Sequence, residues 1–246
     1  MLANWLNESA STVVFSGAGL STESGLQDFR SADRGMWNDR DPMALASLDA
    51  MEENHDEFAR FYRWRIGEMR KHGPNPGHRI LADWERRGII RGVITQNVEN
   101  YHEQAGTSAI AKLHGDLGTL RCMTCHAQYP CTDYMEPKRL TRCARNGCGG
   151  RVRPNVVLFG EWLPERELVR ADAMLDGVEL LLVLGSSLQV SPANQFPRLA
   201  KERGARLVIV NREPTPADGA ADLIIRHSIG EVLRCTDMEL ARLSDG

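Results

Sequence analysis

The chain has 246 residues, of which 42% are hydrophobic and 26% are charged, and its formal net charge at pH 7 is -3. These proportions are typical of an ordinary globular protein, and the length suits one large domain or one domain with a small insert. The near-neutral charge predicts no overall attraction to nucleic acid or to a membrane surface. We therefore expect no direct nucleic-acid partner and no membrane partner.

The N-terminal segment and the cysteines indicate where the protein works. The segment MLANWLNESAS has no basic flank and no long apolar core, so it does not look like a signal peptide. No apolar run approaches the ~20 residues that span a bilayer. Four of the six cysteines form two close pairs rather than a scattered disulfide framework. A reducing, cytoplasmic location is the expectation.

A glycine-rich segment follows the first apolar run of the chain. Val13 to Phe15 is predicted to be a buried strand, and Gly17 and Gly19 come directly after it, before a polar segment that ends at Gly25. Glycines let the backbone turn tightly and approach a pyrophosphate, and the N-terminus of a following helix attracts anions. The pattern predicts a phosphate loop. Because the spacing is not G-x-G-x-x-G, a glycine-rich turn without a ligand is the alternative.

Residues 31–48 are polar and predict a long functional loop. Apolar residues then recur at helical spacing from Met51 to about Lys71, and the segment Gly73 to Pro76 breaks the pattern. A second helix is predicted from about Gly77 to Arg87, with Gly88 at its C-cap.

Four apolar runs share the property that small or polar residues follow each of them. The runs are Val13 to Phe15, Val93-Ile94, Leu180 to Leu184 and Leu207 to Val210, followed by Ser16-Gly17, Thr95-Gln96-Asn97, Gly185-Ser186-Ser187 and Asn211-Arg212-Glu213. Apolar runs separated by helical segments predict a parallel sheet covered on both faces. Ligands bind beyond the carboxyl ends of such strands, so these polar ends are predicted to line one crevice. A fifth run, Leu223 to Ile225, is predicted to be an edge or late strand.

Two cysteine pairs have the spacing of a structural zinc site: Cys122, Cys125, Cys143 and Cys148. Four thiolates leave no open coordination position, so this zinc would stabilise a small lobe and take no part in chemistry. His126 and Cys131 lie near enough in sequence to be substitute ligands. Cys235 is predicted to be a simple buried or surface thiol.

One of the seven histidines stands out by its position. His114 follows a predicted sheet segment and immediately precedes the cysteine insert, and an imidazole can exchange a proton near neutral pH. We interpret His114 as a candidate base, with a purely structural histidine as the alternative.

These segments resemble the ordered motifs of the sirtuins of bacterial type, a family of NAD-dependent protein lysine deacylases. The resemblance extends from about Ser11 to Leu233. The motifs that carry it are Gly17 to Ser21, Gly25 to Arg30, Thr95 to Glu99, Tyr101-His102, Leu113 to Gly115, the four cysteines, Val156 to Glu161, Gly185 to Leu188 and Val210-Asn211.

The resemblance implies an α/β fold, in which a Rossmann-like parallel sheet with helices on both faces carries a small zinc-binding insert and a helical insert. Residues 1–30, 86–120 and 154–246 would form the NAD-binding domain. Residues 31–85 would form a loop and helical insert, and residues 121–153 the zinc-binding insert.

The implied reaction removes an acyl group from a protein lysine, with NAD and zinc as cofactors and acylated-lysine proteins or peptides as partners. The acyl oxygen attacks the ribose carbon that nicotinamide leaves, and the products are nicotinamide, free lysine and an O-acyl-ADP-ribose. His114 would be the base that activates a ribose hydroxyl, and Asn97 would order the ribose or a water.

The same resemblance implies the binding residues. Those expected to bind the cofactor are Ala18, Thr22, Phe29, Arg30, Gln96, Val98, Glu99, Ser186, Ser187, Asn211 and Ile229. The substrate backbone is expected to pair as an added strand with Val156 to Glu161, where Val157, Phe159, Gly160 and Glu161 would contact it.

Two positions depart from the family pattern. Gln27 stands where the family usually has proline, which removes a rigid turn residue. Glu99 stands where the family usually has aspartate, and its longer side chain would shift a carboxylate that is expected to touch the nicotinamide amide.

The acyl group itself is suggested by a second, smaller resemblance. Tyr62 and Arg65 lie three residues apart on a predicted helix and resemble the Y-x-x-R pair of sirtuins that accept succinyl- or malonyl-lysine, while Ala46 falls where those members carry a small residue. Arginine can bind a terminal carboxylate through two parallel hydrogen bonds. The alternative is that Tyr62 belongs to the core, that Arg65 is solvated and that the substrate is acetyl-lysine.

Two other functions remain open from the sequence. The first is mono-ADP-ribosyl transfer at the same site, and the second is a non-catalytic module that senses NAD and binds zinc. His114 and Asn97 favour the deacylase.

Overall fold

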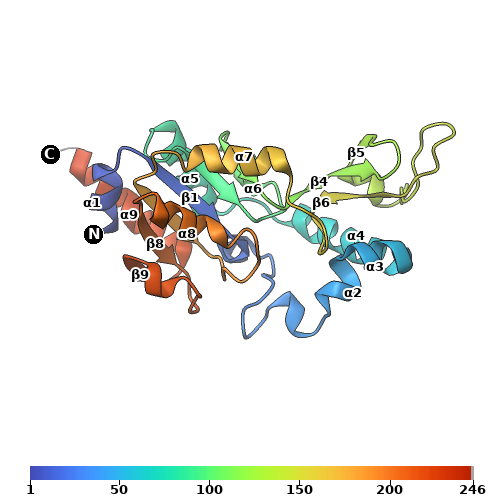
Figure 1. Cartoon of the computed structure of the whole chain (residues 1–246), viewed down its shortest axis with the longest axis horizontal. Helices are drawn as coiled ribbons and strands as arrows, with labels where there is room; N and C mark the ends of the chain where they lie inside the picture. Colours follow the sequence, from blue (N-terminus) through green and yellow to red (C-terminus); the bar gives the residue numbers. More distant parts are fainter. Residues whose placement is uncertain (245–246) are drawn as a thin grey trace.

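The computed structural model describes residues 1–244, and a parallel sheet forms its centre (Figure 1). In spatial order its six strands are β3 (Ile110–Lys112), β2 (Gly92–Thr95), β1 (Thr12–Ser16), β7 (Leu180–Leu184), β8 (Arg206–Val210) and β9 (Leu223–Ile225). Ser16 pairs with both Thr95 and Leu184, so the carboxyl ends of these strands lie level. The predicted parallel sheet is confirmed, with β9 at its edge; β3 is a strand that the apolar runs did not indicate.

Helices cover both faces of the sheet because successive strand residues point to opposite sides. Phe15, Val183 and Ile209 pack toward α7 (Glu165–Met174) and α8 (Gln195–Glu202). Val14, Leu182 and Val208 pack toward α1 (Leu2–Glu8), α5 (Pro76–Arg86) and α9 (Ile229–Ser244). All six of these strand residues are fully buried, which explains why the strands appear as continuous apolar runs.

A second, smaller lobe projects from the sheet (Figure 1). Its antiparallel sheet contains β5 (Gln128–Pro130), β4 (Gly115–Cys122) and β6 (Val152–Val156) in that order. This lobe shares one hydrophobic core with the helices α2 (Pro42–Ala46), α3 (Leu48–Glu53) and α4 (His55–Lys71). The helical insert and the cysteine insert therefore form one packed unit.

The segment between residues 31 and 71 is more helical than its sequence predicts. A 3-10 turn at Met36–Asn38 and helix α2 interrupt the predicted loop, and Asp41 caps α2 by accepting a hydrogen bond from the Met43 amide at 2.8 Å. The predicted helix from Met51 is wrong at its start, because α3 begins at Leu48 and ends before a kink at Asn54. Helix α4 then continues to Lys71, as predicted.

The helix predicted from about Gly77 is present, whereas the glycine-rich segment differs in the type of helix that follows it. Helix α5 begins at Pro76 behind a capping box of Asn75 and His78, and Gly88 has φ +73° just after its end. The glycine-rich segment leads into a 3-10 helix, η1 (Ala18–Ser24), rather than an α-helix, and Gly25 ends it at φ +95°. The short 3-10 helix keeps the chain close to the ends of β1 and β7.

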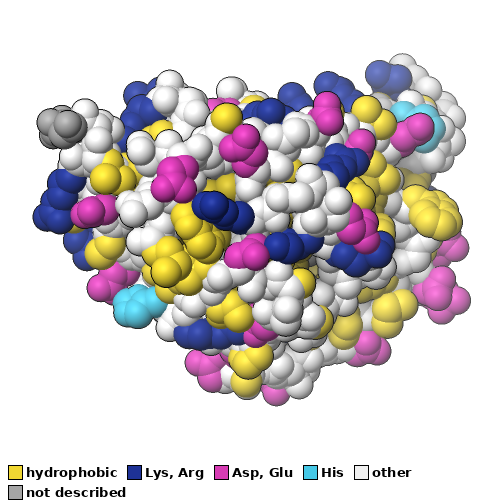
Figure 2. Space-filling view, turned by 60° about the vertical axis from the view of Figure 1, so that its left-hand side comes forward, with side chains coloured by type: hydrophobic (Ala, Val, Ile, Leu, Met, Phe, Trp, Pro, Cys, Tyr) yellow, Lys and Arg dark blue, Asp and Glu magenta, His cyan; other side chains and the backbone are white. Residues whose placement is uncertain are grey.

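The surface carries charges of both signs. Lysine and arginine side chains are interspersed with aspartate and glutamate side chains over the face in Figure 2. Within residues 1–244, no helix is long and apolar enough to cross a membrane. We propose the three-part division of the chain given by the sequence, with one refinement: the packing of α5 against α9 favours a boundary before Pro76.

A pair of buried histidines lies beneath the carboxyl ends of β1 and β2. His78 on α5 and His102 on α6 (Tyr101–Ala105) have ring centroids 5.0 Å apart and are 0% and 2% exposed. His102 Nε2 lies 2.9 Å from Ser16 Oγ, which donates to Thr95 Oγ1 at 2.8 Å. Burial lowers the pKa of His78 from 6.5 to about 3 and the pKa of His102 to about 4.

This pair is expected to make the fold sensitive to acid. The unfolded chain takes up protons at both histidines below pH 6.5, whereas the folded chain does not do so until about pH 4 or lower. The free energy of unfolding should therefore fall as the pH drops below 6.5, by about 2 kcal/mol per histidine at pH 5. Urea titrations at pH 7 and pH 5 measure this loss.

His227 provides the control because it is exposed and pairs with Glu231 on the surface. The loss between pH 7 and pH 5 should shrink in the double variant His78→Gln, His102→Gln, and should stay the same in His227→Gln. An equal loss in all three proteins would show that the buried pair is not the cause.

Candidate functional site

A cavity of ≈ 510 Å³ lies at the carboxyl edge of the parallel sheet, between the sheet and the smaller lobe. The ends of β1, β2, β7 and β8 supply one wall, and residues of α2, α4 and the segment after β6 supply the other. Of the predicted catalytic, cofactor-binding and substrate-binding residues, all but Glu99 line this cavity. Its size is that of a typical small-molecule site.

Several lining residues were not indicated by the sequence. Some come from the polar loop after Arg30, some from apolar packing and some from other segments: Glu23, Ser31, Asp33, Arg34, Trp37, Phe61, Leu117, Leu163, Val190, Pro192 and His227. Two further lining residues were indicated, because Asp28 lies within the motif Gly25 to Arg30 and Glu213 lies in a polar strand end predicted to line the crevice. Phe61 and Leu117 look like ordinary core residues in the sequence.

Glycines form the floor of the cavity because two strand ends meet there. A Cβ atom on Gly17 would lie 2.7 Å from the Gly185 carbonyl oxygen, and one on Gly19 would lie 2.7 Å from the Gly185 Cα. Gly19 N donates to the Gly185 carbonyl at 2.8 Å, and Gly185 has φ +63°. The backbone is therefore exposed to a ligand at the point where a phosphate group is expected to bind.

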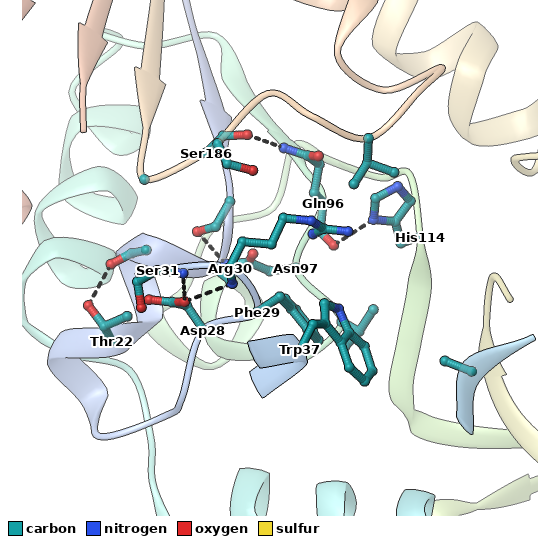
Figure 3. A pocket seen from close by; sticks show the side chains of 18 of the residues that line it. Thr22, Asp28, Phe29, Arg30, Ser31, Trp37, Gln96, Asn97, His114 and Ser186 are labelled. Carbon is teal, nitrogen blue, oxygen red and sulfur yellow. Dashed lines mark hydrogen bonds between the residues drawn. The ribbon is translucent and has the colours of Figure 1, made fainter. Parts of the chain in front are cut away.

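His114 is held with one ring nitrogen free. Its Nδ1 lies 3.0 Å from the Gln96 carbonyl oxygen, which can only accept, so Nδ1 carries the proton and Nε2 keeps its lone pair (Figure 3). Burial, the largest effect, and Arg30 lower the pKa of His114 below its ordinary value of 6.5, against the Gln96 carbonyl, which raises it. The ring is therefore a neutral proton acceptor at pH 7.

The Gln96 side chain links this histidine to the opposite wall. Gln96 Nε2 donates to Ser186 Oγ at 2.7 Å, and the Leu188 amide donates to the same oxygen at 3.2 Å (Figure 3). The ends of β2 and β7 are thus connected across the cavity by a side chain as well as by the sheet.

Asn97 is fixed by three hydrogen bonds. Its backbone nitrogen donates to Thr95 Oγ1 at 3.0 Å. Its side-chain Nδ2 donates to the Gly17 carbonyl at 3.1 Å and to Ser21 Oγ at 3.2 Å. The side chain is 3% exposed, so these contacts set its position. The Asn97 side-chain oxygen stays available to a ligand.

Glu99, the departure from the family pattern, lies behind the cavity wall. Its carboxylate accepts a short hydrogen bond from the Ser21 hydroxyl, and the side chain is 7% exposed. Burial raises the pKa of Glu99, while Ser21 and the charge of Arg65 act in the opposite direction. The longer side chain is thus accommodated by a contact with Ser21.

The loop after η1 covers part of the cavity. Asp28 Oδ1 accepts from the amides of Arg30 and Ser31 at 3.1 and 2.9 Å (Figure 3). Gln27 Nε2 donates to the Arg34 carbonyl at 2.7 Å, so the residue that replaces a proline closes the base of the loop by a hydrogen bond. Phe29 stacks on Trp37 with ring centroids 5.6 Å apart.

The far end of the cavity contains the predicted acyl-binding residues. Ala46, Tyr62 and Arg65 are 8%, 6% and 9% exposed, and all three line the cavity. The Arg65 guanidinium lies 4.8 Å from the centre of the Phe29 ring and donates to Met36 Sδ at 3.7 Å. Within residues 1–244 no carboxylate lies within ion-pair distance of it; burial, the largest effect, lowers its pKa, while the charge of Glu99 raises it. Arg65 is therefore buried rather than solvated.

The segment after β6 uses most of its backbone groups internally. Phe159 donates to the Ala46 carbonyl at 2.9 Å and accepts from Leu48 at 3.1 Å, and the Val157 amide donates to the His114 carbonyl at 2.9 Å. Among the described residues, the Val157 carbonyl and both the amide and the carbonyl of Gly160 make no hydrogen bond. An added peptide strand would meet these three groups rather than the whole predicted segment.

The four predicted cysteines converge at the tip of the smaller lobe. Their sulfur atoms all lie within 4.8 Å of one another, and the Cys122–Cys148 and Cys125–Cys143 pairs are each 3.6 Å apart. Zinc–sulfur bonds of ~2.3 Å place tetrahedral sulfurs ~3.8 Å apart, so the four thiols fit a zinc ion without rearrangement. His126 and Cys131 lie outside the cluster. Tyr129 Oη lies 3.0 Å from Cys143 Sγ and so supports one ligand from outside.

Comparison with known proteins decides the family. The Sir2 family model matches residues 17–192, which is more than half of the chain. The chain belongs to the Sir2 family. A curated relative from Oceanobacillus iheyensis, named an NAD-dependent protein deacetylase, is 46% identical over 97% of this chain and all of its own length. A relative from Archaeoglobus fulgidus, named NAD-dependent protein deacylase 2, is 40% identical over 98% of this chain and 95% of its own.

Solved Sir2 structures share the whole fold. A Sir2 homologue in complex with ADP-ribose has a TM-score of 0.92 and 33% identity, and covers 99% of this chain and 97% of its own. A Sir2 protein with a p53 peptide and NAD+ has a TM-score of 0.87 and 36% identity, and covers 97% and 96%. The family and the fold predicted from the sequence are therefore confirmed, with NAD and zinc as the cofactors that the family and the four-cysteine cluster imply.

The cysteine cluster generates a prediction on metal content. We expect one zinc per chain, and we expect Cys143→Ser or Cys148→Ser to release the metal and unfold the smaller lobe, because structural zinc binding is part of the folding free energy. Metal analysis of the purified protein and thermal unfolding of each variant measure the effect.

Cys235 is the matched control because it is exposed and unpaired. Cys235→Ser should keep its zinc and its thermal stability. Native protein without zinc, or full stability in the Cys143 and Cys148 variants, would contradict the assignment.

Proposed function

We propose that this chain removes acyl groups from lysine side chains of proteins in an NAD-dependent reaction. The observation that carries the proposal is His114, a neutral imidazole whose Nε2 is free at the wall of the cavity that Asn97 and the glycine loop also line. The names of the curated relatives and the ligands of the solved Sir2 structures support the same reaction.

The glycine floor, Ser186, Ser187 and Asn211 would hold the phosphates and the adenosine ribose, with Ile229 near the adenine. Ala18, Thr22, Phe29, Arg30, Gln96 and Val98 would enclose the nicotinamide end. Bound NAD supplies the ribosyl group that accepts the acyl group as nicotinamide leaves. The residues fit this cofactor because an exposed glycine backbone lies between two strand ends, where an added Cβ atom would collide with Gly185.

Two side chains would act on the reacting groups. His114 Nε2 would accept a proton from a ribose hydroxyl, since its pKa is lowered and its other nitrogen is held by the Gln96 carbonyl. Asn97 would orient the ribose or a water through its side-chain oxygen, because its nitrogen is already committed to Gly17 and Ser21. Phe29, Trp37 and Leu117 would exclude bulk water from the cavity.

Product analysis tests the reaction. With NAD and an acetyl-lysine peptide, we expect nicotinamide and free lysine to appear together, and no nicotinamide when the peptide is left out. Nicotinamide release accompanied by ADP-ribose on protein would favour ADP-ribosyl transfer instead, and NAD binding without turnover would favour a sensor.

His114→Ala should abolish deacylation while NAD binding stays nearly intact, because the change removes a proton acceptor and no phosphate contact. Loss of a positioned base typically costs about 10²- to 10⁴-fold in rate. In the native enzyme kcat/KM should fall with decreasing pH, through a pKa below the ordinary value of 6.5. Steady-state kinetics across pH measure the rate loss and the pH dependence, and calorimetric titration with NAD measures the cofactor binding. Unchanged turnover in the variant would refute the role.

The acyl class is the finer part of the proposal. Among the described residues, no carboxylate lies within ion-pair distance of the buried Arg65 guanidinium at the end of the cavity, and the Glu99 charge acts on it from farther away. A buried charge without a close partner is costly. A succinyl or malonyl carboxylate would provide that partner, and Ala46 leaves room beside it. Tyr62 also packs on Phe58 and Phe61, with ring centroids 4.6 and 5.1 Å away, so it contributes to the core as well as to the cavity wall.

Arg65→Met should raise KM for a succinyl-lysine peptide by roughly ten- to a hundredfold, since a lost charge-assisted pair is worth about 1.5 to 3 kcal/mol. KM for an acetyl-lysine peptide should change little. Steady-state kinetics with matched peptides measure the two values.

Arg60→Met is the control, because Arg60 lies on the exposed face of the same helix. It should leave both substrates unaffected. An equal response of both substrates to Arg65→Met would identify a plain deacetylase.

A further inference from the structure

Glu161 was expected to contact the substrate, yet the chain itself occupies its carboxylate. Oε1 accepts a short hydrogen bond from Arg153 Nη2 and a second one from Arg121 Nη2 at 3.1 Å. Oε2 accepts from the Leu158 amide at 2.8 Å. The Glu161 side chain is 16% exposed, so the carboxylate has little capacity left for a substrate.

Arg153 is the fully buried member of this cluster, which consists of Arg121, Arg153 and Glu161. Its side chain is 0% exposed and also donates from Nη1 to the Val156 carbonyl at 2.8 Å and from Nε to Met123 Sδ at 3.1 Å. Arginine suits this task because its planar fork reaches several acceptors at once. Arg153 thus holds both ends of the turn that leads from β6 into the segment 157–160.

The same cluster adjoins the cysteine site. Arg121 on β4 pairs with Arg153 on β6, and the next pair in the register is Cys122 with Val152. Arg121 is thus the sequence neighbour of a predicted zinc ligand, and Arg153 is the sequence neighbour of the residue that pairs with that ligand. At the other end of β6, Val157 donates to the His114 carbonyl and Phe159 bonds to Ala46, so the cluster connects the metal site with the wall of the active-site cavity.

Backbone hydrogen bonds to neighbouring elements fix Val157 and Phe159, and the Glu161 carboxylate fixes Leu158 between them. Gly160 has φ +92°, and the Val157 carbonyl and both backbone groups of Gly160 are left open for a peptide backbone among the described residues. The Leu158 amide, which lies between them, is held by Glu161. The direction of the open groups on either side of Leu158 thus depends in part on the Glu161 carboxylate.

We propose that Arg153 is a positioning residue for the acyl-lysine peptide, which acts by holding Glu161 so that Val157 and Gly160 present their open backbone groups to the substrate. Through β6 it also makes the order of the cysteine site a condition for peptide binding. This proposal rests on the proposed deacylase function.

Kinetics with single substitutions test the proposal on the zinc-loaded protein. Arg153→Met should raise the peptide KM by about ten- to a hundredfold and lower kcat less, with KM for NAD unchanged, because a displaced backbone weakens peptide contacts first. Arg153→Lys, which keeps the charge without the fork, should fall between Arg153→Met and the native enzyme. Arg60→Met, on the exposed face of α4, should match the native enzyme.

Arg121→Met provides a second variant in case Arg153→Met does not fold, because Arg121 contacts the same carboxylate and its side chain is 29% exposed. Arg121→Met should also raise the peptide KM, as Arg153→Met does. A peptide KM within twofold of the native value in folded Arg121→Met and Arg153→Lys would overturn the proposal. An equal change in the peptide KM and the NAD KM would also overturn it.

Hydrogen–deuterium exchange gives a readout that does not depend on turnover. Amides of residues 157–161 should exchange faster in Arg153→Lys and after chelation of zinc from the native protein, while β1 and β7 stay protected. Unchanged exchange at 157–161 in both samples would refute the proposal that Arg153 and the cysteine site hold this segment. If the native enzyme released no nicotinamide with any acyl-lysine peptide, the deacylase would fail, and this exchange experiment would still decide the positioning.

Discussion

The close contact between the ends of β1 and β7 determines the rest of the active-site cavity. Gly17, Gly19 and Gly185 approach so closely that a side chain on any of them would collide with backbone atoms. This contact forces the chain into the short 3-10 helix after β1 and leaves the backbone open toward the cavity. Gln96 and Asn97 then reach the same floor from β2, through Ser186 and Gly17. The parallel register brings these groups together before any ligand arrives.

The large domain could be predicted from the sequence because its signals are local. Each buried strand of the sheet centre is a continuous apolar run, and each polar residue that follows a strand is placed at the carboxyl edge by the parallel register. The cysteine site was also predictable, since thiol spacing reflects the geometry of one ion. His114 could be identified as a candidate, but the Gln96 carbonyl that sets its tautomer could not, because that contact depends on backbone geometry.

The smaller lobe was less predictable because its interactions are long-range. The break at Asn54 lies inside the apolar pattern that predicts one helix from Met51, and the polar composition of residues 31–48 hides α2. Glu161 illustrates the same limit. Its sequence motif resembles a substrate-binding segment, whereas its carboxylate is consumed by two arginines that lie 40 and 8 residues away. Sequence spacing carries no sign of such a contact.

Two separate parts of the fold form the cavity wall, and this arrangement affects how substrate preference can vary within the family. Sheet ends supply the residues expected to handle the cofactor, whereas Ala46, Tyr62 and Arg65 come from helices that belong to the core of the smaller lobe. Substitutions on α2 and α4 would therefore change the proposed acyl end, which does not include the glycine floor or His114. Changes in the sequence of this helical insert would alter the proposed substrate preference, while the residues proposed for the chemistry stay the same. Selectivity and chemistry can then change independently in evolution.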